Sequence, residues 1–239
     1  MPFKILYVSA TQTESDILKN IPGIRVLSDG YRFNNCELIP LNTGVGSVAT
    51  AWTMKQWFSS NEMPDLVINA GIAGSYREDI KIGEVVIPVS DCFADAGIEN
   101  GNEFLTLAEA GMCEPDYYPF TSGQIVCRNR FTDLAVKYLR SVRAITVNTA
   151  TGSEVTIKKL VKKFNPDIET MEGATFFYIC SRENVPFLAL RAISNRVEPR
   201  DKSKWNIPLA LNSLSVKLND LLLTLERRNE IETGFLAMS

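Results

Sequence analysis

Short apolar runs alternate with longer amphipathic stretches along most of the chain, which is the pattern of β-strands joined by crossover helices. The clearest run, Leu66-Val67-Ile68-Asn69-Ala70, is typical of a central parallel strand covered on both faces. The pattern predicts strands over residues 3–10, 25–27, 36–42, 66–70, 84–89, 144–148 and 187–193. It predicts helices over residues 14–20, 47–60, 131–140, 153–164, 172–183 and 208–228. The expected fold class is therefore α/β: a single domain with a mixed central β-sheet flanked by helices.

Two stretches depart from this alternation. Residues 95–123 contain several glycines and prolines and little periodicity, so we expect an excursion from the sheet, of the kind that often forms a lid. Residues 229–239 follow the last predicted helix, and we expect this C-terminal tail to fray. No repeat or linker divides the rest, which predicts one domain over residues 1–228.

Composition changes the picture mainly by exclusion. The 239 residues carry 25 basic and 28 acidic side chains, a net charge of −3 without long blocks of either sign, so neither nucleic acid nor a membrane is an expected partner. The apolar runs are far shorter than the roughly 18–20 residues of a bilayer span, and no secretion signal is recognisable at the start. We therefore expect a cytoplasmic protein, whose five scattered cysteines stay reduced.

The sequence contains no histidine. This removes Ser-His-Asp and Cys-His nucleophilic sites, most catalytic zinc sites and histidine general bases. Acid–base chemistry must then fall to carboxylates, Lys, Tyr or Cys, and we expect neither a metal nor another cofactor.

Two glycine-rich segments follow predicted strands. The segment Gly44-Val45-Gly46-Ser47-Val48-Ala49 fits the G-x-G-x-x-A fingerprint of dinucleotide-binding folds, but the ribose-binding acid is missing, because Asp65 begins the next strand rather than ending it. A tight turn with close helix packing is the simpler interpretation. The segment Gly71-Ile72-Ala73-Gly74 is predicted to turn at the carboxyl end of a central strand, where open α/β sheets bind ligands, and its two glycines would let main-chain N–H groups approach a flat ligand or an anion closely. A plain turn is the alternative there.

Polar side chains near predicted strand ends are further candidates. Glu172 lies at a helix start, where the helix N-terminus stabilises a carboxylate and a capping role alone would explain it. Arg191 lies in the last strand, just before Ser194 and Asn195, and a buried cation needs a partner, which Glu169 or Glu172 could supply. A structural salt bridge is the alternative to a binding site.

Glu14 follows the first predicted strand and, alone, would be interpreted as an exposed acid in the first turn of a helix. Glu14 becomes a candidate because it shares its position with other candidate segments. All of them follow predicted strands: Glu14, residues 71–74, Glu172 and residues 194–195. If those strands are parallel, their carboxyl ends meet at one rim and form one pocket.

The order and content of these segments resemble the purine nucleoside phosphorylase and nucleosidase superfamily over nearly the whole chain. The resemblance rests on residues 9–14, 69–74, 169–174 and 191–195. Within that superfamily, residues 94–99 and 195–208 are similar to the futalosine hydrolase family. The resemblance implies hydrolysis of the N-glycosidic bond of a small-molecule nucleoside, futalosine, which releases hypoxanthine and dehypoxanthine futalosine in menaquinone biosynthesis.

The resemblance also implies roles for particular residues. Glu14 matches the carboxylate that activates water, Glu172 the acceptor of ribose hydroxyl groups and Asn195 the purine-binding position. Such a set suits a reaction that passes through an oxocarbenium-like sugar. Further implied substrate contacts are Met171 under the sugar, Ala73, Gly74, Arg191, Ser194, Val155 and the main chain of Thr156. The resemblance implies a homodimer or higher homo-oligomer, in which residues 95–123 complete the 5′ pocket of a neighbouring subunit.

Asn195 bears on the choice of base. Nucleosidases of the adenosine type carry Asp at this position, because an adenine leaving group benefits from a proton at N7, and Asn cannot supply that proton. A 6-oxopurine needs it less, because charge spreads to O6, where an amide N–H can donate. Asn195 therefore favours hypoxanthine over adenine, although a flipped amide could still bind adenine.

The nucleophile and the 5′ substituent are less constrained. Residues 11–15 lack the glycine and arginine with which related hexameric phosphorylases hold phosphate, which favours water, although Arg77 could still reach an anion. Futalosine carries a benzoate on its 5′ side. The candidate cations for that carboxylate are Arg196, Arg200 and Lys202, and the candidate aromatic walls are Trp205 and Phe104, with solvated surface charge as the alternative for each cation.

Two other functions stay open. One is a hydrolase or phosphorylase of other purine nucleosides, such as inosine or methylthioadenosine. The other is a nucleotide-binding module without catalysis.

Overall fold

Parallel strands form the centre of the fold. Strand β1 (Phe3–Ser9) pairs in parallel with β4 (Cys36–Asn42) and with β5 (Leu66–Ser75), and β13 (Phe187–Arg196) lies parallel to β5 on the far side. The structure, a computed structural model, describes residues 2–101 and 103–236. Because these four strands run the same way, their carboxyl ends meet at one edge of the sheet, as the sequence predicts.

The other elements surround this centre. The remaining strands are β2 (Arg25–Leu27), β3 (Gly30–Phe33), β6 (Val85–Asp91), β7 (Gly97–Asn100), β8 (Glu103–Thr106), β9 (Phe120–Thr121), β10 (Gln124–Val126), β11 (Arg140–Thr146) and β12 (Ile168–Thr170). The helices are α1 (Gln12–Ser15), α2 (Ser47–Ser60), α3 (Arg130–Ala135), α4 (Glu154–Phe164), α5 (Gly173–Arg182) and α6 (Ile207–Leu236), with 3-10 segments η1 (Asp16–Asn20) and η2 (Lys202–Lys204).

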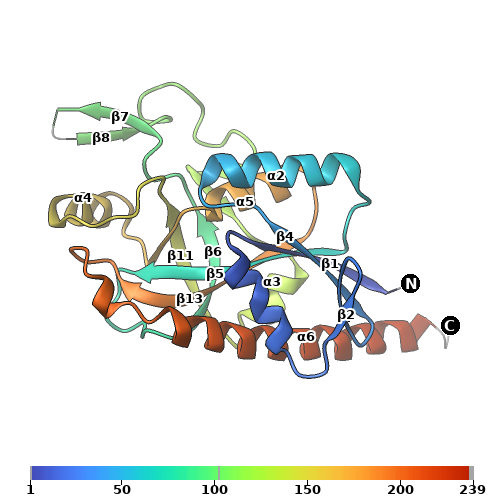
Figure 1. Ribbon diagram of the computed structural model, residues 1–239. Coiled ribbons are helices and arrows are strands. Elements are labelled where there is room, and N and C mark those ends of the chain that lie inside the picture. The colour runs from blue at the N-terminus through green and yellow to red at the C-terminus, as the bar shows by residue number, and fades with distance from the viewer. Residues whose placement is uncertain (1, 102, 237–239) are drawn as a thin grey trace.

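Alternating side chains of the central strands build two apolar layers. Ile5 and Tyr7 of β1 pack in one core with the buried face of α6, whereas Leu6 and Val8 pack in the other with α2 and α5. The helices α2 and α5 accordingly cover one face of the sheet and α6 runs along the opposite face (Figure 1). This alternation is the period-two pattern of a strand buried on both faces.

The sheet also closes on itself at one end. Strand β5 pairs with β13, β13 with β6, β6 with β11, β11 with β12, and β12 again with β5. A third apolar core that includes Ala73, Val86, Val142 and Ile193 fills this ring. The predicted single α/β domain with a mixed central sheet and flanking helices is confirmed. Closure is what brings β12, and Glu172 after it, to the end of β5.

The predicted glycine turn at residues 71–74 is wrong, because β5 continues without a break to Ser75. Both glycines are required by close neighbours rather than by a turn. A Cβ at Gly71 would lie 2.7 Å from Glu14 Oε1, and one at Gly74 would lie 2.8 Å from Val197 Cγ2. Likewise, β13 extends through Asn195 to Arg196 instead of ending at residue 193.

Several predicted boundaries also need correction. The helix predicted over residues 14–20 is α1 followed by the 3-10 turn η1, and the helix over residues 131–140 is the shorter α3. Residues 95–123 were predicted to leave the main sheet, and within them β7 and β8 form a separate two-stranded hairpin that projects from the body of the molecule (Figure 1). Helix α6 runs to Leu236, past its predicted end at residue 228, and residues 237–239 of the predicted tail lie outside the described residues; fraying of the tail from residue 229 stays a prediction.

Across the described ranges, none of the helices has both the length and the apolar content that a bilayer crossing demands.

Candidate active site

Glu14 is buried where β1, α1 and β5 meet, with only 7% of its surface exposed. Its Oε2 accepts hydrogen bonds from the Thr11 N–H at 3.0 Å and the Thr11 hydroxyl at 2.9 Å, and its Oε1 accepts from the Ile72 N–H at 3.0 Å. Glycine at position 71 leaves the space that Oε1 occupies. The carboxylate is thus fixed in one orientation, and the interpretation of Glu14 as an exposed helix acid is wrong.

Glu172 occupies the N-cap position of α5, yet its side chain makes no capping hydrogen bond. Its Oε1 accepts instead from the main-chain N–H of Gly46 at 2.8 Å, at the start of α2. Gly46 has a φ of +92°, a conformation that other residues rarely adopt, which explains the glycine-rich segment without a dinucleotide. Among the residues that the structure describes, none donates to Glu172 Oε2. That oxygen is therefore available to a ligand.

Threonine hydroxyls satisfy the first N–H groups of α5 in place of the N-cap carboxylate. The Ala174 N–H donates to Thr146 Oγ1 at 2.7 Å, and the Gly173 N–H donates to Thr170 Oγ1 at 3.1 Å. The Thr146 hydroxyl in turn donates to Asp91 Oδ1 at 3.0 Å. Because these orphan helix donors already have partners, the N-cap carboxylate is free to turn toward the cavity.

Arg191 is buried beneath the carboxylates, with 2% of its surface exposed. Its Nη1 donates to the main-chain oxygens of Asn69 at 3.0 Å and Leu190 at 2.9 Å, and its Nη2 donates to Asn69 Oδ1. The predicted direct ion pair with Glu169 or Glu172 is wrong, because neutral oxygens take these donors. Such satisfaction keeps a buried cation tolerable without a contacting anion.

Glu169 is held on the other side of the cavity. Its Oε2 accepts from the Tyr76 hydroxyl at 2.6 Å, and its Oε1 accepts from the Thr151 N–H at 2.8 Å. Both oxygens are therefore engaged, and Glu169 acts as a support for the loop before α4.

The buried charges influence one another. Burial raises the pKa of the Glu172 carboxyl, although the Gly46 N–H and the Arg191 charge oppose this. Burial also raises the pKa of Asp91 to about 7, and Asp91 Oδ2 has no partner. Burial lowers the pKa of the Arg191 guanidinium, and the surrounding carboxylates oppose that change. The site therefore gathers carboxyl groups around one cation in a region of low solvent access.

Asn195 sits beside a β-bulge, since the register of β13 against β5 shifts between Ile193 and Asn195. Bulges commonly re-aim a side chain next to a functional site. The Asn195 Nδ2 donates to the Arg196 main-chain oxygen at 2.8 Å, and its Oδ1 accepts from the Ser194 hydroxyl at 2.8 Å. A carbonyl oxygen cannot donate, so this contact fixes which end of the amide is nitrogen. The flipped amide would place two acceptors against each other.

One cavity of about 200 Å³ collects most of the predicted site. Of the predicted residues, its lining includes Glu14, Ala73, Gly74, Met171, Glu172, Ser194 and Asn195. Three predicted residues do not line it. Val155 is 66% exposed on α4, Thr156 lies beside it with its N–H bonded to Ser153 Oγ at 3.2 Å, and Arg191 lies behind the wall. The loop residues Ala150 and Thr151 line the cavity where Val155 and Thr156 were expected.

Sequence reasoning missed several supporting residues. Thr11 was identifiable, because Thr11-Gln12-Thr13-Glu14 has the spacing of a capping box. Gly46 and Ile72 act through main-chain N–H groups, which no side-chain pattern reveals. Tyr76 had no local signal, because its partner Glu169 lies 93 residues further along the chain.

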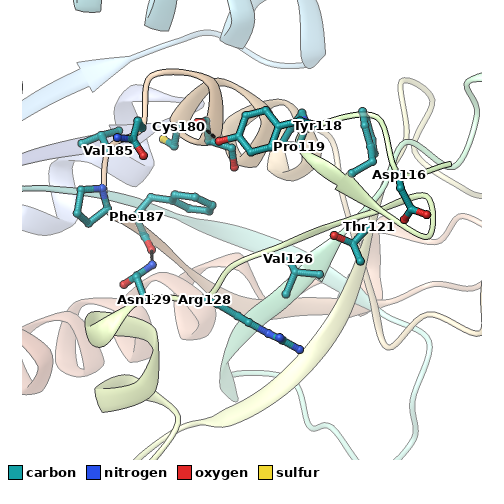
Figure 2. Close-up of a pocket in the computed structure, with 14 residues that line it drawn as sticks. Asp116, Tyr118, Pro119, Thr121, Val126, Arg128, Asn129, Cys180, Val185 and Phe187 are labelled. Atoms are coloured by element: carbon teal, nitrogen blue, oxygen red, sulfur yellow. Dashed lines mark hydrogen bonds between the residues drawn. The ribbon is translucent and has the colours of Figure 1, made fainter. Parts of the chain in front are cut away.

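A larger hollow of about 520 Å³ lies elsewhere, between β9, β10 and the end of α5 (Figure 2). Two hydrogen bonds join residues that line this hollow. The Tyr118 hydroxyl donates to the Ser181 main-chain oxygen at 2.6 Å, and Asn129 Nδ2 donates to the Phe187 main-chain oxygen at 2.7 Å. Its carboxylate Asp116 already accepts from the Ser122 N–H at 2.6 Å. Size therefore does not locate the chemistry; the paired carboxylates lie in the smaller cavity.

Comparison with known proteins identifies the family. The family model described as "Phosphorylase superfamily" matches residues 6–225, nearly the whole chain. The chain belongs to the phosphorylase superfamily. The resemblance inferred from the sequence segments is thereby confirmed.

Relatives within the phosphorylase superfamily carry two kinds of name. A futalosine hydrolase from Streptomyces coelicolor is 30% identical over 211 residues, 86% of this chain and 85% of that protein. A futalosine hydrolase from Thermus thermophilus is 26% identical over 91% of this chain and 94% of that protein. A 5′-methylthioadenosine/S-adenosylhomocysteine nucleosidase from Buchnera aphidicola is also 26% identical, over 90% of each chain.

Solved structures share the fold. Futalosine hydrolase from Helicobacter pylori matches with a TM-score of 0.74 and 18% identity, covering 92% of this chain and 97% of that one. A mutant methylthioadenosine nucleosidase from the same organism, with 5′-methylthioadenosine in its active site, matches with a TM-score of 0.76 and 20% identity, covering 93% and 99%. Both substrate types therefore occur on this fold.

Proposed function

We propose that this chain is an N-ribosyl hydrolase that cleaves the N-glycosidic bond of futalosine and releases hypoxanthine. The observation that carries the proposal is the cavity that brings together the buried carboxylate of Glu14, the partly buried carboxylate of Glu172 and Asn195 in a fixed amide orientation. The similarity to futalosine hydrolases supports the same reaction class.

The two carboxylates divide the work. Three donors hold Glu14, which accepts a proton from a water molecule. At the same time the oxygen of that water forms a bond to C1′ of the ribose. The C1′–N9 bond breaks with its electron pair on the purine, which then takes a proton from solvent. Glu172 Oε2 accepts hydrogen bonds from ribose hydroxyl groups, and Met171 lies under the sugar. Carboxylates near the ring stabilise the positive charge that develops on it.

Asn195 favours a 6-oxopurine as leaving group. Its Nδ2 keeps one N–H for O6 after bonding the Arg196 carbonyl, and its Oδ1 keeps one lone pair for an N7–H. Adenine offers an amino donor at position 6, which meets the wrong end of this amide. Because the Arg196 carbonyl opposes a flip, the amide discriminates between the two bases.

Water as the nucleophile is supported by the surroundings of Arg77. Its Nε donates to Asp167 Oδ1 at 2.8 Å and its Nη2 donates to Asn165 Oδ1 at 2.9 Å. Arg77 does not line the cavity. The cation that could have held a phosphate is thus committed elsewhere, and hydrolysis is the simpler reaction for this site.

Self-association belongs to the same proposal. On α2, which begins beside the cavity, Val48 is 83% exposed and Trp52 is 72% exposed. Exposed apolar side chains grouped on one helix are typical of interfaces, and we propose a homodimer through this face. Analytical ultracentrifugation should give twice the chain mass, with dissociation on Trp52→Glu; a monomeric wild type would contradict this.

The function is tested by offering futalosine, inosine and methylthioadenosine, each with and without phosphate, and by separating the released base chromatographically. We expect hypoxanthine from futalosine at a rate independent of phosphate. The second candidate, a methylthioadenosine nucleosidase, has the support of relatives of that name at comparable identity. Preferential release of adenine would favour that candidate and overturn the proposal, and purine binding without any release would indicate a binding module.

A further inference from the structure

Two guanidinium groups on one wall of the cavity have unfilled donors. Arg196 and Arg200 both line the cavity. Arg196 Nη2 donates to the Glu78 main-chain oxygen at 2.6 Å, but its Nη1 is buried without a partner. Among the described residues, the Arg200 guanidinium has no hydrogen bond or ion pair; its contact is the Trp205 ring, whose centroid lies 5.7 Å from Cζ. Arg200 is exposed, so water solvates its donors, and these donors are available to an anionic group of a ligand that enters the cavity.

Neighbouring acids do not neutralise Arg200. The adjacent carboxylate, Asp201, accepts from the Ser203 N–H at 3.0 Å and from the Ser203 hydroxyl at 2.7 Å, and these bonds hold the pKa of Asp201 below its usual value. Glu198 pairs with Lys204 at 3.0 Å. Both carboxylates that lie near Arg200 in the sequence therefore have other partners.

Trp205 gives Arg200 a fixed support. The Asn206 N–H donates to the Ser194 main-chain oxygen at 2.8 Å, which ties the segment after Trp205 to β13. Trp205 lines the same cavity as Ser194. A guanidinium stacked on an aromatic ring keeps its planar edge of N–H donors free, and that edge matches a carboxylate in a bidentate arrangement.

We propose that Arg200, stacked on Trp205, binds a carboxylate that the substrate carries outside its purine and ribose, on an aromatic group that packs near the Trp205 ring. The inference rests on the proposed function and narrows its substrates to nucleosides with an anionic aryl substituent. It also selects one of the three candidate cations, because Lys202 does not line the cavity and Arg196 is anchored through Glu78. A methylthio substituent has nothing for this donor edge to bind.

The test compares Arg200→Gln with a control variant, Lys202→Gln. The control removes the same charge from Lys202, an exposed residue two positions further along the chain that does not line the cavity. Futalosine and inosine are the substrates, because they share hypoxanthine and ribose and differ in the benzoate. We expect Arg200→Gln to raise the KM for futalosine about tenfold or more, the usual effect of losing a charge-assisted hydrogen bond. The kcat/KM for inosine should stay within about twofold, and Lys202→Gln should change neither substrate.

Two further measurements complete the test. Arg200→Lys should recover part of the loss, because it keeps the charge and loses the bidentate edge. Calorimetric binding of futalosine should weaken in Arg200→Gln by the same factor as KM rises. The methyl ester of futalosine should be insensitive to Arg200→Gln, since it lacks the anion.

Several results would overturn the inference. Arg200 would have no such role if Arg200→Gln left the KM for futalosine unchanged, or if it lowered kcat/KM for inosine as much as for futalosine. The same holds if Arg196→Gln, and not Arg200→Gln, selectively raised the KM for futalosine. In those cases a wild type that cleaves futalosine leaves the proposed function standing. A wild type that neither binds nor cleaves futalosine would refute both.

Discussion

At the scale of single residues, hydrogen bonds fix the orientation of the polar side chains of the site, and some of these side chains keep an open donor or acceptor. Glu14 is fixed by the Thr11 and Ile72 donors, whereas Glu172 is fixed through Oε1 alone and keeps Oε2 open. Asn195 is anchored at both ends of its amide and keeps one donor and one acceptor. In the proposed reaction, groups that are pre-organised in this way would not have to reorient when charge develops on the sugar and the base.

Glu172→Gln should lower kcat/KM for futalosine by about 10- to 100-fold, because a neutral amide accepts ribose hydroxyl groups more weakly than a carboxylate does. The protein should stay folded, since Gln can still accept from the Gly46 N–H. Steady-state kinetics together with circular dichroism check this. Retained activity would remove Glu172 from the mechanism.

Asn195→Asp should shift the preference toward adenine nucleosides. A carboxylate would face the Arg196 carbonyl oxygen, so the new side chain is stabilised when protonated and can then offer a proton to N7 of adenine. We expect the ratio of kcat/KM for methylthioadenosine over inosine to rise about tenfold or more. An unchanged ratio would mean that the amide does not select the base.

At the scale of elements, glycines decide how closely strands and side chains approach. The segment after Ala70 was predicted to turn, because glycines often mark turns, but β5 continues and its Gly71 makes room for the Glu14 carboxylate. The apolar runs of β1, β5 and β13 were predictable, since each is buried on both faces. Their ends were not, because polar and glycine residues at a ligand-binding edge lack the apolar signal of the core.

Gly71→Ala tests this reading of β5. The new methyl group would lie 2.7 Å from Glu14 Oε1 and must displace this oxygen from the Ile72 N–H. We therefore expect kcat to fall about tenfold or more, whereas the free energy of unfolding should change little. Gly152→Ala is the matched control, because its Cβ would make an ordinary 3.4 Å contact with Arg200 Cβ. Equal effects of the two substitutions on kcat would contradict the assignment.

Thr146→Val tests how α5 presents its N-cap carboxylate. The substitution leaves the Ala174 N–H and Asp91 Oδ1 without a partner, at about 1–3 kcal/mol for each buried group. Urea unfolding should show lower stability, and kcat should fall as well because Glu172 loses its fixed position. Thr146→Ser keeps the hydroxyl and should restore both quantities; if Ser fails to rescue kcat, the hydroxyl is not what positions Glu172.

At the scale of the whole molecule, the site depends on ring closure of the sheet. The return of β12 to β5 places Glu172 near Glu14, although the two are far apart in sequence. The superfamily resemblance predicted this set of residues, whereas the pairings that assemble it could not be derived from local patterns. The same limit applies to Arg191, whose partner was expected to be a carboxylate and is Asn69.

Closure also buries Asp91, which gives stability a pH dependence. Its pKa is raised from 3.8 to about 7, so between these values the native state keeps a proton that the unfolded chain has lost. The free energy of unfolding should therefore fall as the pH rises through this window, by up to about 4 kcal/mol. Asp91→Asn, which cannot titrate, should show a flatter profile in urea unfolding between pH 4 and pH 7.5. Parallel profiles for the two proteins would contradict the assignment to Asp91.

The most direct test of the central claim is the rate of hypoxanthine release from futalosine by wild type and by Glu14→Gln. The claim is that Glu14 takes the proton of a water that attacks a nucleoside held by Glu172 and Asn195. We predict turnover by the wild type, and a loss of at least about 100-fold in kcat with nearly unchanged futalosine affinity in Glu14→Gln. Turnover by Glu14→Gln at the wild-type rate would contradict the account.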